Sequence, residues 1–224
     1  TVATLLLFAA GVPQALDLAI KRAGEVGADL VLATDPDADR LGGVSKSGDH
    51  FEFLNGNEFA VVITRYRLEK LREAGKLPAK PLVIKTQVTT ELITRITEAF
   101  GGVVIGDLLV GFKYIGNILK QLEQHGRFGN VEASLSDFIL GTEESHGLLA
   151  TPEIRDKDAA GASVVLAEMA SDLATEGRTL YDYLIDTYKQ YGYHRNFLRS
   201  TIMQGASGSA AIQKIQRLLR ENPP

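Results

Sequence analysis

Short apolar runs alternate with amphipathic stretches along most of the 224-residue chain. Apolar positions recur at helical spacing over residues 12–26, and Gly27 follows as a C-terminal stop. The run ADLVLAT at residues 28–34 then predicts a short strand that is buried on both faces. The apolar start of the chain, TVATLLLFAAG at residues 1–11, predicts another strand or a frayed boundary.

A hairpin and a helix are predicted next. Residues 41–44 and 51–53 have the composition of strands, and the sequence Ser-Gly-Asp at residues 47–49 supplies the turn between them. Asn57 has a side chain that favours a helix N-cap, so a helix is predicted to follow it. These elements together predict a first α/β/α module over residues 1–75, and we expect its sheet to be mostly parallel.

The same pattern repeats after a polar stretch. The sequence EAGKLPAKP at residues 73–81 contains one glycine and two prolines, which is typical of a boundary between domains. The alternation that follows predicts a second α/β/α module over residues 76–192, with a mostly parallel sheet and helices on both faces. Its strands are predicted at residues 82–86, 103–105 and 138–140, and its helices at residues 90–100, 115–124, 158–175 and 180–191.

The last segment, residues 193–224, predicts a linker, a strand and a helix that ends before Pro223. Within it the sequence GASG at residues 205–208 reads as an ordinary turn.

Composition narrows the classes of function. With 45% hydrophobic residues the chain can form ordinary cores, and no apolar run is long enough to span a membrane. The net charge of −4 argues against a nucleic-acid partner, because a phosphate backbone needs a basic surface. The absence of cysteine excludes disulfides and thiolate metal sites and agrees with the cytoplasm, where we expect the protein. Because the first residue is not Met, we expect the chain to start inside a longer reading frame.

The strand predicted at residues 28–34 leads into an acidic loop in which Asp35, Asp37 and Asp39 alternate with other residues. In an extended loop such side chains point the same way, so their oxygens can converge on one ion, and hard oxygen ligands suit Mg²⁺. An EF-hand is excluded because Arg40 and Lys46 stand where its glycine and glutamate are required. A solvated acidic turn is the alternative, and the position after a buried strand favours a site.

Four motifs in this chain resemble those of one enzyme family. The sequence DPDADRLG at residues 35–42 resembles the metal-binding loop of the α-D-phosphohexomutases, the phosphoglucomutase and phosphomannomutase family. GTEESHG at residues 141–147 resembles the sugar-binding loop, and GFKYIG at residues 111–116 resembles the loop before the third-domain helix. RDKD at residues 155–158 is similar to a segment typical of the phosphoglucomutase branch.

The resemblance runs from about residue 15 to the C-terminus and implies the middle portion of a four-domain enzyme. The two predicted modules would be its second and third domains, and residues 193–224 would be a linker and the start of a truncated C-terminal domain.

The resemblance also implies roles for individual residues. Glu143 and Ser145 would bind sugar hydroxyls, which suits an acceptor carboxylate beside a hydroxyl that both donates and accepts. An acidic cluster at a helix start is the alternative for this triplet. His146 stands where family sequences vary and receives no role.

Four cationic side chains match the family motifs. Arg40 would balance the aspartates and contact the phosphoryl group, and Lys157 is a candidate for proton transfer or phosphosugar contact. Lys113 and Arg155 would contact the phosphosugar. For Arg155 and Lys157 the alternative is a self-neutralised surface cluster with the neighbouring aspartates.

The activity implied is intramolecular phosphoryl transfer between hexose 1-phosphate and hexose 6-phosphate. It would run through a phosphoserine and glucose 1,6-bisphosphate with Mg²⁺, with glucose phosphate as the expected substrate. A phosphopentomutase and a noncatalytic phosphosugar- or metal-binding protein are the alternatives. The family's phosphoserine loop and C-terminal phosphate-clamp loop are both missing from the 224 residues, so we expect this chain alone to be inactive.

Overall fold

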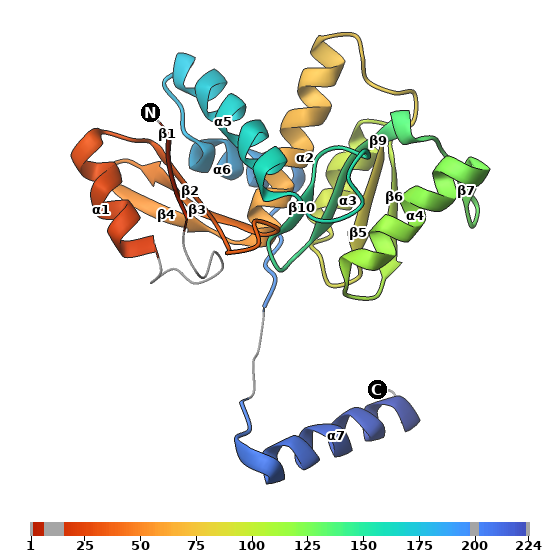
Figure 1. Cartoon of the computed structure of the whole chain (residues 1–224). Helices are drawn as coiled ribbons and strands as arrows, with labels where there is room; N and C mark the ends of the chain where they lie inside the picture. Colours follow the sequence, from red (N-terminus) through yellow and green to blue (C-terminus); the bar gives the residue numbers. More distant parts are fainter. Residues whose placement is uncertain (1, 7–15, 198–201, 223–224) are drawn as a thin grey trace. The chain divides into compact units, whose positions relative to one another are not determined.

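The computed structural model describes residues 2–6, 16–197 and 202–222 (Figure 1). The chain divides into two compact units, Thr1–His194 and Arg195–Pro224. The first unit holds two four-stranded sheets with helices against them, and the described part of the second holds helix α7 (Gly205–Glu221).

The first sheet has the strand order β1-β2-β3-β4. Strand β1 pairs with β2 in parallel, whereas β2, β3 and β4 pair antiparallel. The predicted hairpin is confirmed, because two residues separate β3 from β4 and so short a connection permits only antiparallel pairing. The strands are β1 (Val2–Leu6), β2 (Leu30–Thr34), β3 (Leu41–Ser47) and β4 (His50–Leu54).

The second sheet has the order β10-β9-β5-β6. Its central strand β5 pairs in parallel with both β6 and β9, and the short strand β10 pairs antiparallel with β9. The α/β class is thus confirmed. The mostly parallel sheet expected in each module is found in the second sheet but is wrong for the first, where short connections make β2, β3 and β4 pair antiparallel. The strands are β5 (Leu82–Thr86), β6 (Val103–Leu108), β9 (Phe138–Glu143) and β10 (Gly147–Leu149), with a small hairpin of β7 (Arg127–Phe128) and β8 (Val131–Glu132) and a short 3-10 helix at Leu135–Asp137.

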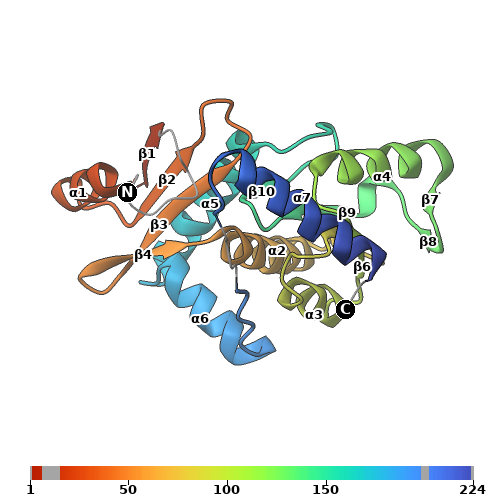
Figure 2. The same ribbon diagram turned by 90° about the horizontal axis from the view of Figure 1, so that it is seen from below.

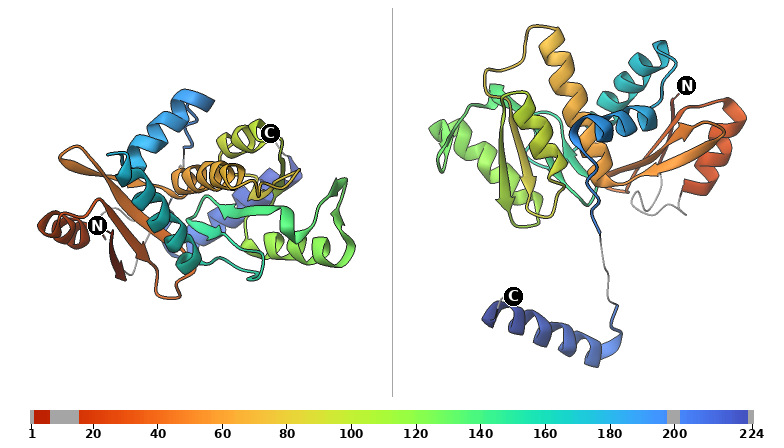
Figure 3. Two further views of the ribbon diagram at one scale, coloured as in Figure 1. Left: turned by 90° about the horizontal axis from the view of Figure 1, so that it is seen from above. Right: turned by 180° about the vertical axis from the view of Figure 1, so that it is seen from behind.

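Helices cover both faces of each sheet (Figures 2 and 3). Helix α2 lies between the two sheets and contacts α3, α5, α6 and β9. Within the described residues, no helix is long and apolar enough to cross a membrane. The boundary expected between residues 75 and 76 stays a prediction. The helices of the first unit are α1 (Asp17–Val26), α2 (Gly56–Glu73), α3 (Leu92–Ala99), α4 (Phe112–His125), α5 (Ala159–Thr175) and α6 (Leu180–Tyr191).

The position of strand β2, which is covered on both faces, explains why its sequence is continuously apolar. Leu30 and Leu32 point into a core shared with α2, α5 and α6, while Val31 and Ala33 point to the opposite face and pack with α1. Alternate side chains of a strand face opposite sides, so a strand covered on both faces needs apolar residues throughout.

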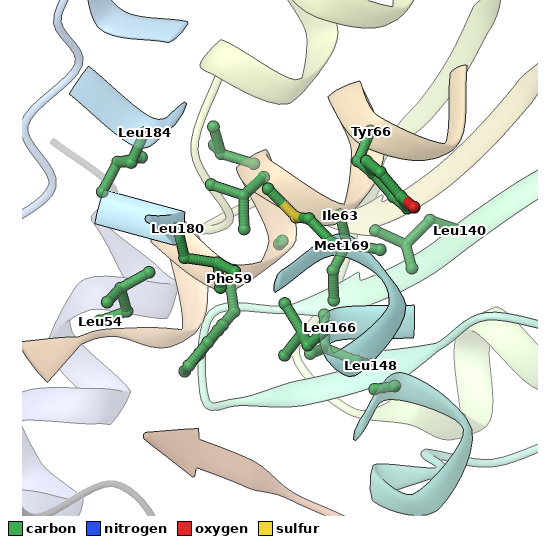
Figure 4. Packing of buried hydrophobic residues seen from close by; sticks show 14 of the residues in the cluster. Leu54, Phe59, Ile63, Tyr66, Leu140, Leu148, Leu166, Met169, Leu180 and Leu184 are labelled. Carbon is green, nitrogen blue, oxygen red and sulfur yellow. The ribbon is translucent and has the colours of Figure 1, made fainter. Parts of the chain in front are cut away.

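The largest core joins the two sheets through α2 (Figure 4). Phe59 of α2 is fully buried and belongs to the same cluster as Leu140 of β9, Leu166 of α5 and Leu184 of α6. Burial of each such side chain contributes about 1.5–3 kcal/mol, so the two sheets are held together by apolar packing.

The start of α2 differs from the prediction. The N-cap is Asn55, whose side chain accepts from Glu58 N while the Glu58 carboxylate accepts from Asn55 N. Asn57 lies inside the first turn, and its Oδ1 accepts from Thr90 N at 2.9 Å. The Asn57 cap is therefore wrong, because the capping box forms two residues earlier and frees Asn57 to bind the loop after β5.

The C-terminal segment also differs in part. The turn predicted at residues 205–208 is the first turn of α7, where Gly208 packs so closely on Met203 that an added Cβ would lie 2.6 Å from its carbonyl carbon. No strand is present at residues 193–197, and the prediction for residues 198–201 lies outside the described part. The helix predicted at residues 12–26 is observed as α1, and its expected start also lies outside the described residues.

Two glycine substitutions test the packing of the first sheet. A Cβ on Gly43 of β3 would lie 2.2 Å from the carbonyl oxygen of Val31, whereas a Cβ on Gly24 of α1 would have nothing within 4 Å. We expect Gly43→Ala to lower the free energy of unfolding by about 1–3 kcal/mol. Gly24→Ala is the matched control and should raise it by up to about 1 kcal/mol. Urea unfolding measures both, and equal effects of the same sign would contradict this packing.

Candidate functional site

The acidic loop folds back directly after β2. The amide of Ala38 donates to Asp35 O at 3.0 Å, and Ala38 has a positive φ of 55° that tightens the turn. As a result one oxygen from each of Asp35, Asp37 and Asp39 lies within 4.8 Å of the others. The structure therefore brings the three sequence-predicted metal ligands together.

Asp35 is the most enclosed of the three, with 5% of its surface exposed. Its Oδ1 accepts from the amides of Asp39 at 3.2 Å and Arg40 at 3.1 Å, and its Oδ2 accepts from Arg40 Nε at 2.8 Å. Burial opposes ionisation, but the hydrogen bonds from Arg40 outweigh it, so the pKa of Asp35 lies below its ordinary value. Asp35 is thus a carboxylate at neutral pH.

Asp39 connects this loop to the RDKD segment. Its Oδ2 pairs with Lys157 Nζ at 2.6 Å. Burial of Lys157 disfavours its charge, yet the hydrogen bond that Lys157 donates to Asp39 prevails and raises the pKa of the ammonium group. The other oxygen, Asp39 Oδ1, is buried, finds no hydrogen-bond partner in the part of the chain that the structure describes, and lies 3.4 Å from Arg40 Nε. A buried carboxylate oxygen without a hydrogen bond, in a group of three carboxylates, fits a hard divalent cation.

Glu143 is the last residue of β9 and is 4% exposed. Its Oε1 accepts from the amide of Gly111, at the start of α4, at 2.6 Å. Burial raises the pKa of Glu143, and Gly111 and Lys157 partly offset that rise. A strand and a turn surround this residue, so the alternative of an acidic helix start is wrong.

The turn after β9 carries Ser145 on its exposed side. The neighbouring Glu144 accepts from Thr86 Oγ1 at 3.2 Å, which ties the sugar-loop turn to the end of β5. Gly147 opens β10, and an added Cβ there would lie 2.6 Å from Lys157 Cδ and 3.3 Å from Glu143 Oε2. The side chain of Lys157 therefore lies directly against the backbone of Gly147 and extends beyond it to Asp39.

The two loops are also joined through the backbone. Arg40 forms an isolated antiparallel bridge with Gly147. The next residue, Leu41, donates from its amide to His146 O at 3.1 Å, and its own carbonyl lies 3.0 Å from His146 Nδ1. The acidic loop and the segment at residues 141–147 thus lie side by side and form one continuous surface.

The remaining two predicted residues lie at the surface of α4. Lys113 is exposed, with its Nζ 5.1 Å from the ring centroid of Tyr114. Arg155 pairs with Glu123 of α4 at 2.9 Å. Their roles in binding stay predictions.

Three residues that contact the candidate site were not predicted from the sequence. Thr86, the amide of Gly111 and His146 all contact the loops, but each contact depends on how distant strands meet. Lys85 is 2% exposed, donates to Thr89 O at 3.1 Å and pairs with Glu91 at 2.7 Å. The ion pair between Lys85 and Glu91 could have been predicted from the sequence only by noting a lysine within an apolar strand and a glutamate six residues later.

The structure is that of an α/β protein in which three carboxylates and two cationic side chains gather beside the ends of strands. The model of phosphoglucomutase/phosphomannomutase, alpha/beta/alpha domain III, matches residues 55–191. The chain belongs to the phosphoglucomutase/phosphomannomutase family, and the resemblance seen in the sequence is confirmed.

Named relatives agree with this family. Phosphoglucomutases of Staphylococcus aureus strains MRSA252 and MSSA476 are each 33% identical over 212 residues, which cover 94% of this chain and 36% of the relative. The chain therefore spans about a third of the length of these curated relatives.

Solved structures share the fold. A Thermus thermophilus protein described as a phosphomannomutase is similar at a TM-score of 0.61 and 25% identity, over 81% of this chain and 36% of that one. The Paramecium phosphoglucomutase parafusin, in its open form, has a TM-score of 0.57 at 18% identity, over 80% of this chain and 27% of its own.

The lowered pKa of Asp35 gives a pH prediction. Because its folded-state pKa lies below the ordinary value of 3.8, ionised Asp35 stabilises the fold above that pH, and the stabilisation is lost as pH falls through the folded-state pKa. We expect Asp35→Asn to cost about 1–3 kcal/mol near neutral pH and progressively less below pH 3.8. Urea unfolding at several pH values measures the difference, with the exposed Asp49→Asn as the control. A difference that stays constant down to pH 3 would contradict the assignment.

Proposed function

We propose that residues 1–224 form the metal- and sugar-binding part of an intramolecular phosphotransferase that interconverts hexose 1-phosphate and hexose 6-phosphate, with glucose phosphate as the preferred substrate. The observation that carries the proposal is the ion pair of 2.6 Å between Asp39 and Lys157. This ion pair joins the acidic loop to the RDKD segment, and the stem of Lys157 also lies beside Gly147 and Glu143, which supports a single site.

In this proposal Asp35, Asp37 and Asp39 hold Mg²⁺, as the family resemblance implies. When bound, the ion supplies charge neutralisation for the phosphoryl group. Glu143 presents a carboxylate oxygen to vicinal sugar hydroxyls while its other oxygen is fixed by Gly111, and Ser145 reaches the sugar from the exposed side of the turn.

The cationic residues hold the phosphate and a proton. Arg40 lies beside the aspartates and supplies donors to the phosphoryl oxygens. The raised pKa of Lys157 keeps it protonated, so it serves as a proton donor or a phosphate contact rather than a base. Lys113 and Arg155 complete the phosphosugar contacts by resemblance.

The full reaction would need a phosphoserine that donates its phosphoryl group to the sugar and recovers the other phosphate from glucose 1,6-bisphosphate. Neither the family's serine loop nor its phosphate clamp is in the 224 residues. We therefore propose that the chain alone binds metal but does not turn over. A second candidate is a noncatalytic phosphosugar- or metal-binding protein.

Calorimetry with MgCl₂ tests the metal site. Asp37 is exposed and belongs to the group of three oxygens within 4.8 Å, so Asp37→Asn removes one ligand charge without opening the core. We expect it to weaken Mg²⁺ binding by about tenfold or more. The control is Asp49→Asn, in the exposed hairpin turn, which should leave the affinity unchanged. Equal affinities of all three proteins would remove the aspartate loop from the metal assignment.

Turnover and binding measurements separate the two candidate functions. A coupled assay with glucose 1-phosphate should show activity in the polypeptide of the complete reading frame and none in residues 1–224, with mannose and ribose phosphates as competing substrates. Calorimetry should show Mg²⁺ binding by residues 1–224 but only weak binding of glucose 1-phosphate. Tight sugar-phosphate binding by this chain, with no activity on any hexose phosphate in the complete protein, would favour the noncatalytic candidate.

A further inference from the structure

We propose that His146 is a positioning residue that couples the metal loop to the sugar loop, so that metal binding at the aspartates orders the turn that carries Glu143 and Ser145. The proposal rests on the proposed function in one respect, because it takes Asp35, Asp37 and Asp39 as the metal ligands.

The coupling follows a short series of contacts. Asp35 binds both the amide and the guanidinium of Arg40. Leu41 is the next residue, and both of its backbone polar groups face His146, at 3.1 Å for the amide and 3.0 Å for the carbonyl. A carboxylate that reorients toward a metal ion shifts Arg40, and the two hydrogen bonds of Leu41 pass that shift to the sugar-loop turn.

The backbone of His146 has a conformation that carries a cost for a residue with a side chain. Its φ is 70°, a conformation that glycine adopts freely and other residues adopt at a cost. The residue is only 9% exposed, and its ring lies 5.9 Å from that of Phe53. Glycine would adopt this backbone at a lower conformational cost, whereas His146 adds a buried ring that bonds the carbonyl of Leu41.

The ring acts as a fixed donor. The carbonyl of Leu41 can only accept, so Nδ1 carries the proton. Burial lowers the pKa of His146, with Arg40 adding to the effect, so the ring is neutral at pH 7 and this hydrogen bond does not depend on protonation.

The turn has little freedom to absorb a displacement. Gly56, the first residue of α2, approaches it so closely that an added Cβ would lie 2.2 Å from Glu144 O and 2.5 Å from His146 N. On another side, Glu144 is held by Thr86. A movement of Leu41 is therefore expected to shift residues 144–146 together, because the turn cannot deform by itself.

Amide hydrogen exchange read by mass spectrometry tests the coupling, with and without saturating MgCl₂. In the unaltered chain we expect Mg²⁺ to slow exchange by about fivefold or more both in the metal loop, residues 35–41, and in the sugar loop, residues 142–147. In His146→Gly, which fits the positive φ but lacks the ring, slowing should be confined to residues 35–41. His146→Asn should restore it, because asparagine tolerates this backbone and its amide can donate to Leu41 O.

The possible outcomes are distinct. Slowing that spreads to residues 142–147 equally in all three proteins would overturn the role of His146. Slowing confined to residues 35–41 in the unaltered chain would overturn the coupling while leaving the metal site intact. No Mg²⁺-dependent slowing anywhere would overturn the metal site and the coupling together. Circular dichroism of each variant establishes that its fold is retained.

Discussion

Three carboxylates held within 4.8 Å of one another repel, and the arrangement of the site follows from the need to balance them. Arg40 comes from the same loop, but Lys157 comes from more than one hundred residues later in the sequence. The segment before α5 is brought into place by backbone hydrogen bonds, from Ala159 N to Ala38 O at 3.2 Å and from Asp158 N to Leu148 O at 2.8 Å. The acidic loop is therefore bonded to the first residue of α5 as well as to Lys157.

Apolar packing supplies the rigidity that this charge balance requires. Helix α2 lies between the two sheets, and its first turn touches two loops of the second sheet: Asn57 binds Thr90 after β5, and Gly56 lies against the turn after Glu143 of β9. Since loops at strand ends are positioned by the strands that carry them, fixing the sheets on one helix also fixes their loops relative to each other. The site is thus assembled from connections while the regular elements supply the support.

Much of the fold could be read from the sequence because its signals are local. The run at residues 28–34, the hairpin after it and the stop at Gly27 all depend on neighbouring residues, and the alternation of aspartates predicted their convergence. The predictions that were wrong or missing concerned the exact residue at which a helix begins and the contacts between segments distant in the sequence. Asn55 and Asn57 are equally good caps by residue type, but only Asn55 has a glutamate, Glu58, three residues later to complete a capping box. The partner of Lys157 and the backbone of His146 depend on contacts between distant segments, which no local pattern encodes.

Gly147 has a consequence for how this site can vary. The space that a side chain would occupy there is filled by the methylene stem of Lys157, 2.6 Å from the Cβ position, with the Glu143 carboxylate just beyond at 3.3 Å. Residue 147 and residue 157 thus share a single volume. Lys157 can extend to Asp39 only because Gly147 has no side chain. The position of the Lys157 ammonium group is therefore controlled by a residue that carries no functional group.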